Sequence, residues 1–331
     1  MRVTLKDVAE RTGFEASTVS RVLSGDKRCY ASQESKRIIR EAAKELDYTP
    51  NCFARALRQR RSNMVGIVGG FFNSEVNGYL MSGVTEALQA HGYGTIMIES
   101  RPSFALEEQA LRELRARRVD GILFHSGLYG SKSAQYIPAD IPCVVHSAEK
   151  VPGHPWVMTD RAAGVRKAVE RLVELGHRRI AFVAPSIEGT EQKRAGYMAA
   201  LRDAGLPDET QVHVTGSETG LVREYLMRHR AEFKSVTAII CSNDLMAIEA
   251  MFALKALGLE IPHDCSVIGH DDISTAGIIS PQLTTLRQPR DAMRNHSVDM
   301  LVRLMKGEKV PNVTLVPEFI ERESIGPCRQ A

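Results

Sequence analysis

The N-terminal run VTLKDVAERTG (3–13) is followed after three residues by STVSRVLSG (17–25), and these two runs are the most informative part of the sequence. Apolar residues recur at helical spacing in both segments, and Thr4 is a candidate N-cap for the first. Gly13, which ends the first run, can adopt the left-handed backbone of a tight turn. The pattern predicts two short helices joined by a turn.

A third helix completes the unit, because Ser32 is a candidate cap for an amphipathic segment, Gln33–Leu46. Three such helices predict a helix-turn-helix, whose second helix enters the major groove of DNA. Arg21 is the best candidate for a guanine contact, since its guanidinium can donate to both O6 and N7. A helical interaction module that binds no DNA is the alternative. The candidate DNA-contacting residues of this unit are Thr4, Lys6, Ala16, Ser17, Thr18, Ser20 and Arg21.

Charge is unevenly distributed along the 331 residues. Residues 1–61 contain 14 Lys and Arg against 8 Asp and Glu, a net charge of +6, whereas the whole chain carries +3. A basic segment on a mildly acidic body indicates a polyanionic partner for that segment, although a solvated basic face is the simpler alternative. Lys36 and Arg37 join Lys6 as candidates for phosphate contacts.

Several classes of protein are disfavoured by composition. The longest apolar runs, such as Met64–Phe72, fall far short of the roughly 20 residues that span a bilayer. No apolar segment like a secretory signal follows the charged N-terminus, so we expect a cytoplasmic protein without membrane contact. Six scattered cysteines form no CxxC pair, which predicts neither a zinc site nor a disulfide framework. We expect no cofactor.

From Met64 onward, short apolar strands alternate with amphipathic helices. The predicted strands are MVGIVGG (64–70), GTIMIES (94–100), VDGILFH (119–125), PCVVHS (142–147), RIAFVA (179–184), VTAIICS (236–242) and CSVIGH (265–270). The predicted helices include 76–91, 105–118, 161–176, 190–205, 218–230 and 243–258. This alternation predicts an α/β body of doubly wound parallel sheets, which bind ligands at the carboxyl ends of their strands.

Enzyme motifs are absent from the sequence. No GxSxG, HExxH, P-loop or GxGxxG is present, and the Gly69-Gly70 pair lacks the third glycine of a dinucleotide fingerprint. His270-Asp271-Asp272 allows acid–base chemistry or a metal in principle, but it lies at a strand-end turn, where we expect a binding role instead. We therefore expect a binding protein and no enzyme.

The chain resembles the lactose-repressor (LacI/GalR) family of transcriptional regulators along nearly its whole length. Besides the two N-terminal runs, the resemblance rests on LDYTPNCFARALR (46–58), GHRRIAFV (176–183), SNDLMAIEAM (242–251), SVIGHDDI (266–273) and SPQLTTLRQP (280–289). It implies a helix-turn-helix head over 1–48, a hinge helix and linker over 49–61, and a periplasmic-binding-protein-like body over 62–331. The body would have two halves, with chain crossings near 160, 290 and 318.

The resemblance also implies DNA contacts in the hinge. The hinge helix would run from about Asn51 to Arg58, with Arg55 on DNA and Leu57 wedged into the central base step of the minor groove. The alternative is ordinary helix packing. One departure is Glu15, near which the family usually has a serine that caps the recognition helix. Ala16 and Ser17 occupy the positions most used for base choice, so no operator sequence can be inferred.

By the same resemblance, the effector would be bound at the strand ends of the body. Asp271 is the first candidate, because its carboxylate can accept two hydroxyl hydrogen bonds, and Asn243 offers a donor and an acceptor. Alternative roles are open for several of these residues: Asn243 can cap a helix, and Asp272 can be a turn residue. Each histidine can be structural. The candidate effector-binding residues are Asn77, His125, Ser147, Asp160, Lys193, Asn243 and Asp271.

The class of effector is inferred from positions where this chain differs from the family pattern. Many family members have aromatic residues where this chain has Val76-Asn77 and Thr215, and Arg where it has Lys193. Without those stacking platforms, and with His125, Ser126, His146 and Ser147 at strand ends, the site favours a small hydroxylated effector over a purine. A sugar, or a sugar acid whose acidic group meets Lys193, fits best. A regulator whose pocket binds nothing and a solute-binding protein are the alternatives.

These expectations combine into one function. We expect a homodimer that binds a pseudo-palindromic operator and represses carbohydrate or related catabolic genes, with the effector altering its affinity for DNA. The sequence ends at Ala331 without the leucine-heptad tail of tetrameric members, which favours a dimer. Helices such as Val76–His91 are candidates for its interface.

Overall fold

A computed structural model shows two compact units, Met1–Ser62 and Asn63–Ala331. The described residues are 3–26, 29–49, 61–70, 74–100, 103–125, 132, 134–147, 150–185, 190–207, 212–215 (backbone only), 220–233 and 235–329. The predicted division of the first unit at residue 48 remains a prediction, because the hinge segment lies outside the described residues.

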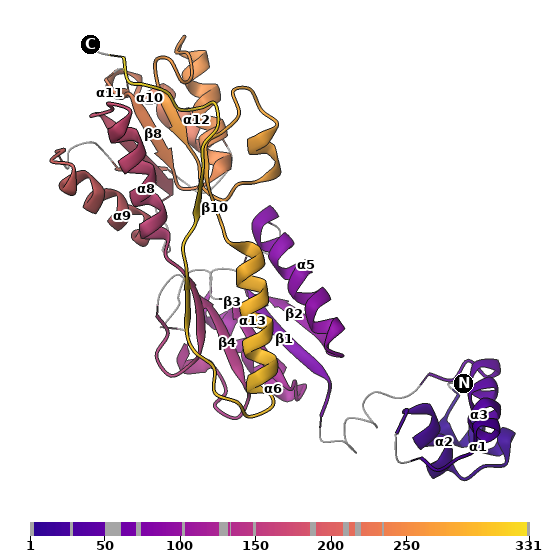
Figure 1. Ribbon diagram of the computed structural model, residues 1–331. Coiled ribbons are helices and arrows are strands. Elements are labelled where there is room, and N and C mark those ends of the chain that lie inside the picture. The colour runs from indigo at the N-terminus through magenta and orange to yellow at the C-terminus, as the bar shows by residue number, and fades with distance from the viewer. Residues whose placement is uncertain are drawn as a thin grey trace. The chain divides into compact units, whose positions relative to one another are not determined.

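The first unit contains the three predicted helices (Figure 1). Their bounds are α1 (Leu5–Thr12), α2 (Ala16–Leu23) and α3 (Gln33–Glu45). Thr4 is the N-cap of α1, and the Asp7 carboxylate accepts hydrogen bonds from its N–H at 2.6 Å and its hydroxyl at 2.8 Å. Ser32 caps α3 by accepting from the Ser35 N–H at 3.0 Å, and Gly13 ends α1 at φ +71°. Local caps therefore determine these helix ends.

A small apolar core holds the three helices together. One buried cluster contains Val8 of α1, Val19 and Val22 of α2, and Ile39 of α3, with small alanines beside them. Because these side chains recur at helical spacing, their burial leaves the opposite helix faces exposed. The unit is the predicted three-helix head.

The second unit begins with a six-stranded parallel sheet and its helices, which we call the first half. The strand order is β11-β5-β4-β3-β1-β2. Its strands are β1 (Met64–Gly69), β2 (Gly94–Glu99), β3 (Gly121–His125), β4 (Cys143–Ser147), β5 (Trp156–Thr159) and β11 (Val313–Leu315). Helices α5 (Glu75–Ala90) and α13 (Arg290–Leu304) pack on one face, and α6 (Phe104–Ala116) packs on the other.

The second half is built on a four-stranded parallel sheet in the order β7-β6-β8-β9. Its strands are β6 (Ile180–Pro185), β7 (Val212–Thr215), β8 (Ala238–Cys241) and β9 (Ser266–Ile268). Its helices are α8 (Arg161–Glu174), α9 (Glu191–Asp203), α10 (Leu221–Arg228), α11 (Arg230–Phe233) and α12 (Asp244–Ala256). Helices α8 and α9 cover one face, and α10 and α12 cover the other. Two doubly wound parallel sheets confirm the predicted fold class.

The chain crosses between the halves three times, as expected. It leaves the first half after β5, returns before α13, and leaves again after β11, and Figure 1 shows β10 in one of these passages. Strands β10 (Thr285–Arg287) and β12 (Glu318–Ile320) pair antiparallel in a separate ribbon.

The strand and helix predictions were incomplete. Strands β5, β7, β10 and β11 and helix α13 were not predicted. The helix expected over 218–230 is α10, which ends at Arg228, and a separate short helix, α11, begins at Arg230. Strands of three or four residues are too short for a recognisable alternation of apolar and polar residues. Helix α13 lacks a clear apolar stripe because its apolar residues lie around much of its circumference.

Among the described residues, no helix is long and apolar enough to cross a membrane. Within the same described part of the chain, no three His, Cys, Asp or Glu side chains are grouped to hold a metal ion.

Candidate functional site

The outward face of α2 is the candidate DNA-reading surface. Val19 and Val22 point into the core, whereas Ser17 and Arg21 are exposed and Ala16, Thr18 and Ser20 are half-buried. Arg21 makes no ion pair with the described residues, so its guanidinium is available for a base edge. Thr4 and Lys6 are exposed at the start of α1. Glu15 occupies the N-cap of α2, but its side chain makes no capping hydrogen bond.

Arg37 differs from the other candidate phosphate contacts. Its guanidinium forms ion pairs on α3 with Glu34 at 2.6 Å and Glu41 at 3.0 Å. These carboxylates raise the pKa of Arg37 and offset its charge. Lys6 and Lys36 are therefore better placed for phosphates. The hinge candidates Asn51, Arg55, Leu57 and Arg58 lie outside the described residues.

In the body, the strongest cluster of polar groups forms where β9 ends. Asp271 is half-buried at φ +114°, and its carboxylate accepts from His270 Nδ1 at 2.9 Å and Gln288 Nε2 at 3.3 Å. Burial raises the pKa of this carboxyl, but His270 and Lys193 outweigh burial and bring the pKa to about 2. Asp271 is thus a carboxylate under all physiological conditions.

Asp272 holds the Asp271 turn in place. Its carboxylate accepts from Arg287 Nε and Arg322 Nη2, each at 2.6 Å, and its carbonyl accepts from Arg290 at 3.3 Å. Burial raises the pKa of Asp272, but the two arginines reverse this effect and lower it. The prediction that Asp272 is only a turn residue was incomplete, since it joins three segments that are distant in sequence.

Two cations lie near Asp271. Lys193, in the first turn of α9, is only 7% exposed and donates to the Ser242 carbonyl. Burial lowers the pKa of Lys193 to about 8. Arg161 begins α8, and its charge acts on Lys193, Asp271 and His125, so it lies among groups from both halves. Sequence reasoning missed Arg161, although it follows the predicted Asp160 directly.

The half-buried His125 and the buried His146 form a hydrogen-bonded relay at the ends of β3 and β4. The two Nδ1 atoms lie 3.3 Å apart, His146 Nε2 contacts Ser297 Oγ, and that hydroxyl donates to the Met293 carbonyl at 2.7 Å. The hydroxyl can then only accept from His146 Nε2–H, so His146 Nδ1 accepts from His125 Nδ1–H.

Burial determines the charge of His125, and the relay determines which of its ring nitrogens carries the proton. Burial, with the charge of Arg161, lowers the pKa of His125 to about 4, and burial lowers that of His146 to about 3. Neutral His125 carries its proton on Nδ1, so its Nε2 is a hydrogen-bond acceptor. His146 has the structural role offered as the alternative, and Ser297 of α13 was not predicted.

The remaining predicted effector residues have defined local roles. Asn243 caps α12 by accepting from the Met246 N–H at 2.8 Å, and Asp160 caps α8 by accepting from the Ala163 N–H at 2.9 Å. The capping alternative for Asn243 is therefore correct, and a ligand contact by its amide remains a prediction. Asn77 is half-buried in the first turn of α5, and Ser147 is buried at the end of β4.

Asp244 supports this site from behind. It is fully buried, and its carboxylate accepts from the Thr285 hydroxyl at 2.5 Å and the Ile273 N–H at 2.8 Å. Burial raises the pKa of Asp244 to about 6. A side chain at Gly269 would place its Cβ 2.1 Å from an Asp244 oxygen, which explains glycine at that position.

The two halves also touch at the N-terminus of α5. The Glu75 carboxylate accepts from the Ser274 N–H at 2.6 Å and from its hydroxyl at 3.1 Å. Nearby, the Arg290 guanidinium lies 4.9 Å from the centre of the Tyr79 ring. The Glu75–Ser274 contacts link α5 of the first half to the second half, whereas the Arg290–Tyr79 contact joins the starts of α13 and α5 within the first half.

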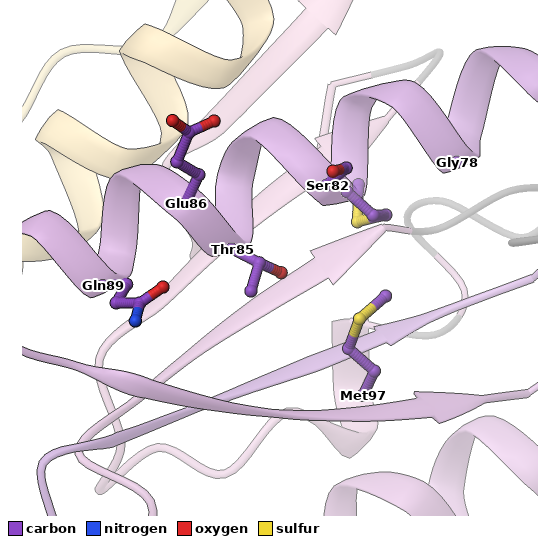
Figure 2. Close-up of a pocket in the computed structure, with 7 residues that line it drawn as sticks. Gly78, Ser82, Thr85, Glu86, Gln89 and Met97 are labelled. Carbon is purple, nitrogen blue, oxygen red and sulfur yellow. The ribbon is translucent and has the colours of Figure 1, made fainter.

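A groove of about 500 Å³ lies between α5 and the edge strand β2. Figure 2 shows Thr85 of α5 and Met97 of β2 projecting into the space between the helix and the strand. The full lining is Gly78, Met81, Ser82, Thr85, Glu86, Gln89 and Met97. This groove is separate from the Asp271 cluster, since it shares no residue with it.

A helix-turn-helix head together with a two-half α/β body defines a class of DNA-binding regulators. Two family models match this chain: bacterial regulatory proteins of the lacI family over residues 4–51, and the periplasmic binding protein-like domain over residues 169–325. The transcriptional regulator GalS of Salmonella typhimurium is 30% identical, covering 98% of this chain and 96% of its own. The chain therefore belongs to the lacI family and is a DNA-binding transcriptional regulator.

Solved structures agree with this assignment. The lac repressor dimer bound to operator and the anti-inducer ONPF matches with a TM-score of 0.90 at 26% identity, covering 98% of this chain and 99% of that one. The transcriptional regulator CelR in complex with cellobiose matches with a TM-score of 0.70 at 29% identity, covering 98% and 100%. The relatives are regulators and not enzymes.

Proposed function

We propose that the protein is a repressor of carbohydrate or related catabolic genes that releases its operator when a small hydroxylated effector binds between the halves of the body. The observation that carries this proposal is the polar cluster after β9, where the Asp271 carboxylate accepts from His270 and Gln288. The His125–His146 pair lies at strand ends of the first half, and the charge of Arg161 acts on both His125 and Asp271. A ligand bound there touches both halves and changes their relative stability.

The hydrogen-bonding groups of the cluster suit hydroxyl groups. The Asp271 carboxylate retains lone pairs for hydroxyl donors, and His125 Nε2 is an acceptor with its tautomer held by the relay. Among known structures, CelR was solved with cellobiose. The absence of aromatic platforms at Val76 and Asn77 argues against a purine that needs stacking.

We further propose a homodimer, since two heads can then read two half-sites of a pseudo-palindromic operator. Strand β2 lies at the edge of its sheet, and the groove between it and α5 exposes Met97. On α12, Leu245 and Phe252 are about 60% exposed on one face, and Ile278, which follows the short helix η2 (Ser274–Gly277), is also exposed. A second copy would cover these apolar side chains.

The proposal is tested with the full-length chain and DNA. Sites selected from random duplexes should contain an inverted repeat, and fluorescence anisotropy should then measure operator affinity against a panel of sugars, sugar acids, sugar phosphates and nucleosides. Thermal melts of the same mixtures detect any ligand that binds the folded state. We expect a hydroxylated effector to raise the melting midpoint and to weaken operator binding.

The outcomes that contradict the proposal are distinct. Specific operator binding that no panel member alters, with no shift in any melt, contradicts the effector role and favours a regulator that acts through DNA alone. A ligand that strengthens operator binding shows a corepressor instead of an inducer. Sedimentation equilibrium at micromolar concentration should show two copies per particle, and a monomer would contradict the dimer.

A further inference from the structure

The Asp271 carboxylate is held through one of its two oxygens. His270 Nδ1 lies 2.9 Å from Oδ1, and Gln288 Nε2 lies 3.3 Å from the same oxygen. Because a carboxylate oxygen has two lone pairs, these two donors fill Oδ1. Oδ2 makes no hydrogen bond with the described residues, and the Asp271 side chain is 23% exposed. The remaining acceptor capacity of Asp271 therefore belongs to Oδ2.

The hydrogen bond to Oδ1 requires the ring proton of His270 on Nδ1. A bare Nδ1 would direct its lone pair at a carboxylate oxygen 2.9 Å away, and two acceptors repel each other at that distance. Gln288 Nε2 also lies 3.4 Å from Nδ1, but a protonated Nδ1 has no lone pair to offer, so Gln288 donates to Asp271. His270 is thus the nearer of two donors to the same oxygen.

The other ring nitrogen of His270 agrees with this assignment. Nε2 is buried and has no hydrogen-bond partner among the described residues. A proton on Nε2 would bury an N–H group without an acceptor, which costs more than a bare lone pair. The ring is therefore neutral, and burial keeps the pKa of His270 at about 4.

The backbone of Asp271 is fixed by the same two segments. His270 follows β9, Gln288 follows β10, and the Asp271 N–H donates to the Leu286 carbonyl at 2.8 Å. Asp271 has a φ of +114°, which residues other than glycine rarely adopt. Such a conformation persists only where the surrounding contacts enforce it, and it determines where the carboxylate points.

From this arrangement we propose that His270 is a positioning residue of the effector site: together with Gln288 it holds Oδ1 of Asp271 and leaves Oδ2 to accept hydrogen bonds from effector hydroxyl groups. The proposal rests on the proposed function, because it takes Asp271 as an effector contact. The His270 side chain is fully buried, so it acts through Asp271 and does not touch the effector. A carboxylate that is fixed beforehand loses no rotational freedom when a ligand binds, which raises affinity.

The protonation of the ring is measurable without any ligand. Two-bond ¹H–¹⁵N correlation spectra of the full-length protein, labelled with ¹⁵N at histidine, distinguish rings protonated on Nδ1, on Nε2 and on both nitrogens. The signals of His270 are assigned by their loss in His270→Asn. At pH 7 we expect a neutral ring with its proton on Nδ1. A ring protonated on Nε2, or on both nitrogens, overturns the proposal.

Three substitutions separate the donor from the bulk of the ring. The amide nitrogen of asparagine can take the place of Nδ1, that of glutamine takes the place of Nε2, and phenylalanine keeps a ring without a donor. We expect His270→Asn to bind effector within about threefold of the wild type, and His270→Gln and His270→Phe each to lose about tenfold. His270→Gln is the matched control, since both variants are amides and only the position of the donor differs.

A fourth variant tests the second donor. Gln288→Met removes the longer of the two hydrogen bonds to Oδ1 and should weaken effector binding by about threefold. Titration calorimetry of the full-length chain with D-glucose, D-galactose, D-ribose and cellobiose measures these affinities, and the fluorescence of Trp156 checks that each variant is folded. If His270→Phe does not fold, the comparison of the asparagine and glutamine variants and the ring spectrum still decide.

The results that overturn this proposal differ from those that overturn the proposed function. Equal losses in His270→Asn and His270→Gln would show that the ring, and not its Nδ1 donor, is required. Unchanged affinity in a folded His270→Phe would show that Asp271 needs no such support. If no sugar binds the wild type or alters operator binding, the proposed function is contradicted, whereas the ring spectrum still confirms or refutes the hydrogen bond by which His270 holds Asp271.

Discussion

The head and the body handle charge in opposite ways. In the head, the candidate contacts such as Arg21 and Lys6 are exposed, and residues 1–62 contain no histidine. In the body, Lys193, His146 and His270 are buried together with carboxylates. Exposed charges are available to a polyanion and are screened by salt, whereas buried charges respond to ligands and protons that reach their site.

The difference indicates what each unit recognises. DNA presents a dense surface charge, so a rigid helix with exposed polar groups is sufficient to contact it. A small ligand must instead replace the water of every group that it contacts, so its site needs groups fixed beforehand. The relay behind His125 and the arginine clamp on Asp272 provide that rigidity.

The largest expected difference between the two units is in their stability at acidic pH. The folded pKa values of His125, His146 and His270 are about 4, 3 and 4, well below their ordinary value of 6.5. As the pH falls, these histidines are protonated in the unfolded state before they are protonated in the folded state. The folded state therefore loses stability from pH 6.5 down to about pH 4. Between pH 7 and 5 the body should lose a few kcal/mol of unfolding free energy.

Urea unfolding followed by Trp156, the single tryptophan, measures this loss in the body. Asp244 works in the opposite direction, since its pKa is raised to about 6 and its protonation stabilises the fold below that value, but it is one group against three. The head, without histidine, should retain its helical signal in amide NMR at pH 5. An unchanged urea midpoint for Trp156 would contradict the neutral buried histidines.

Asp271→Asn should affect the body alone. Asparagine tolerates the φ of +114° but cannot accept charge-assisted hydrogen bonds from two hydroxyls, so effector affinity should fall about a hundredfold. Operator affinity without effector should change less than twofold, as measured by anisotropy. Loss of the folded signal of Trp156 would show that Asp271 is structural instead.

Leu57→Ala tests the hinge expected from the family resemblance. A leucine wedge stabilises kinked DNA only at the specific site, so its removal should weaken operator binding about thirtyfold and leave random DNA binding nearly unchanged. Competition titrations with operator and random duplexes measure both affinities. Equal losses on the two DNAs would refute the wedge.

Arg21→Ala and Arg37→Ala compare an arginine that is unpaired among the described residues with an ion-paired arginine of the head, by their contributions to operator affinity. The exposed Arg21 should contribute about 1–3 kcal/mol to operator binding, roughly tenfold or more, with relaxed preference at one base pair. Arg37, already paired with Glu34 and Glu41, should contribute less than about threefold. Similar losses in the two variants would mean that charge, and not base recognition, explains the role of Arg21.

The sequence predicted the head better than the body. The ends of α1 and α3 depend on Thr4, Asp7, Gly13 and Ser32, which act on backbone groups within three or four residues. The body strands missed by prediction, such as β5 and β11, are three or four residues long and are defined by their neighbours in the sheet. Local chemistry is visible in a sequence, whereas strand order is not.

The candidate effector site was predicted only in part. Asp271, Lys193 and His125 lie within range of the charge of Arg161, which was not predicted, and their contact with an effector stays a prediction. Its position next to Asp160, at a predicted strand-to-helix junction, was a usable signal. No such signal existed for Ser297, which lies 151 residues from its partner His146.

The family, the helical head and the alternation that produces two parallel sheets could all be predicted from the sequence, because they depend on periodicity and on residues close together in the chain. Packing was needed to define which nitrogen of His125 accepts and that Asp272 joins Arg287 to Arg322. The physical reason is that burial and hydrogen-bond partners belong to groups brought together by packing, and these groups lie 15 to 151 residues apart in the chain.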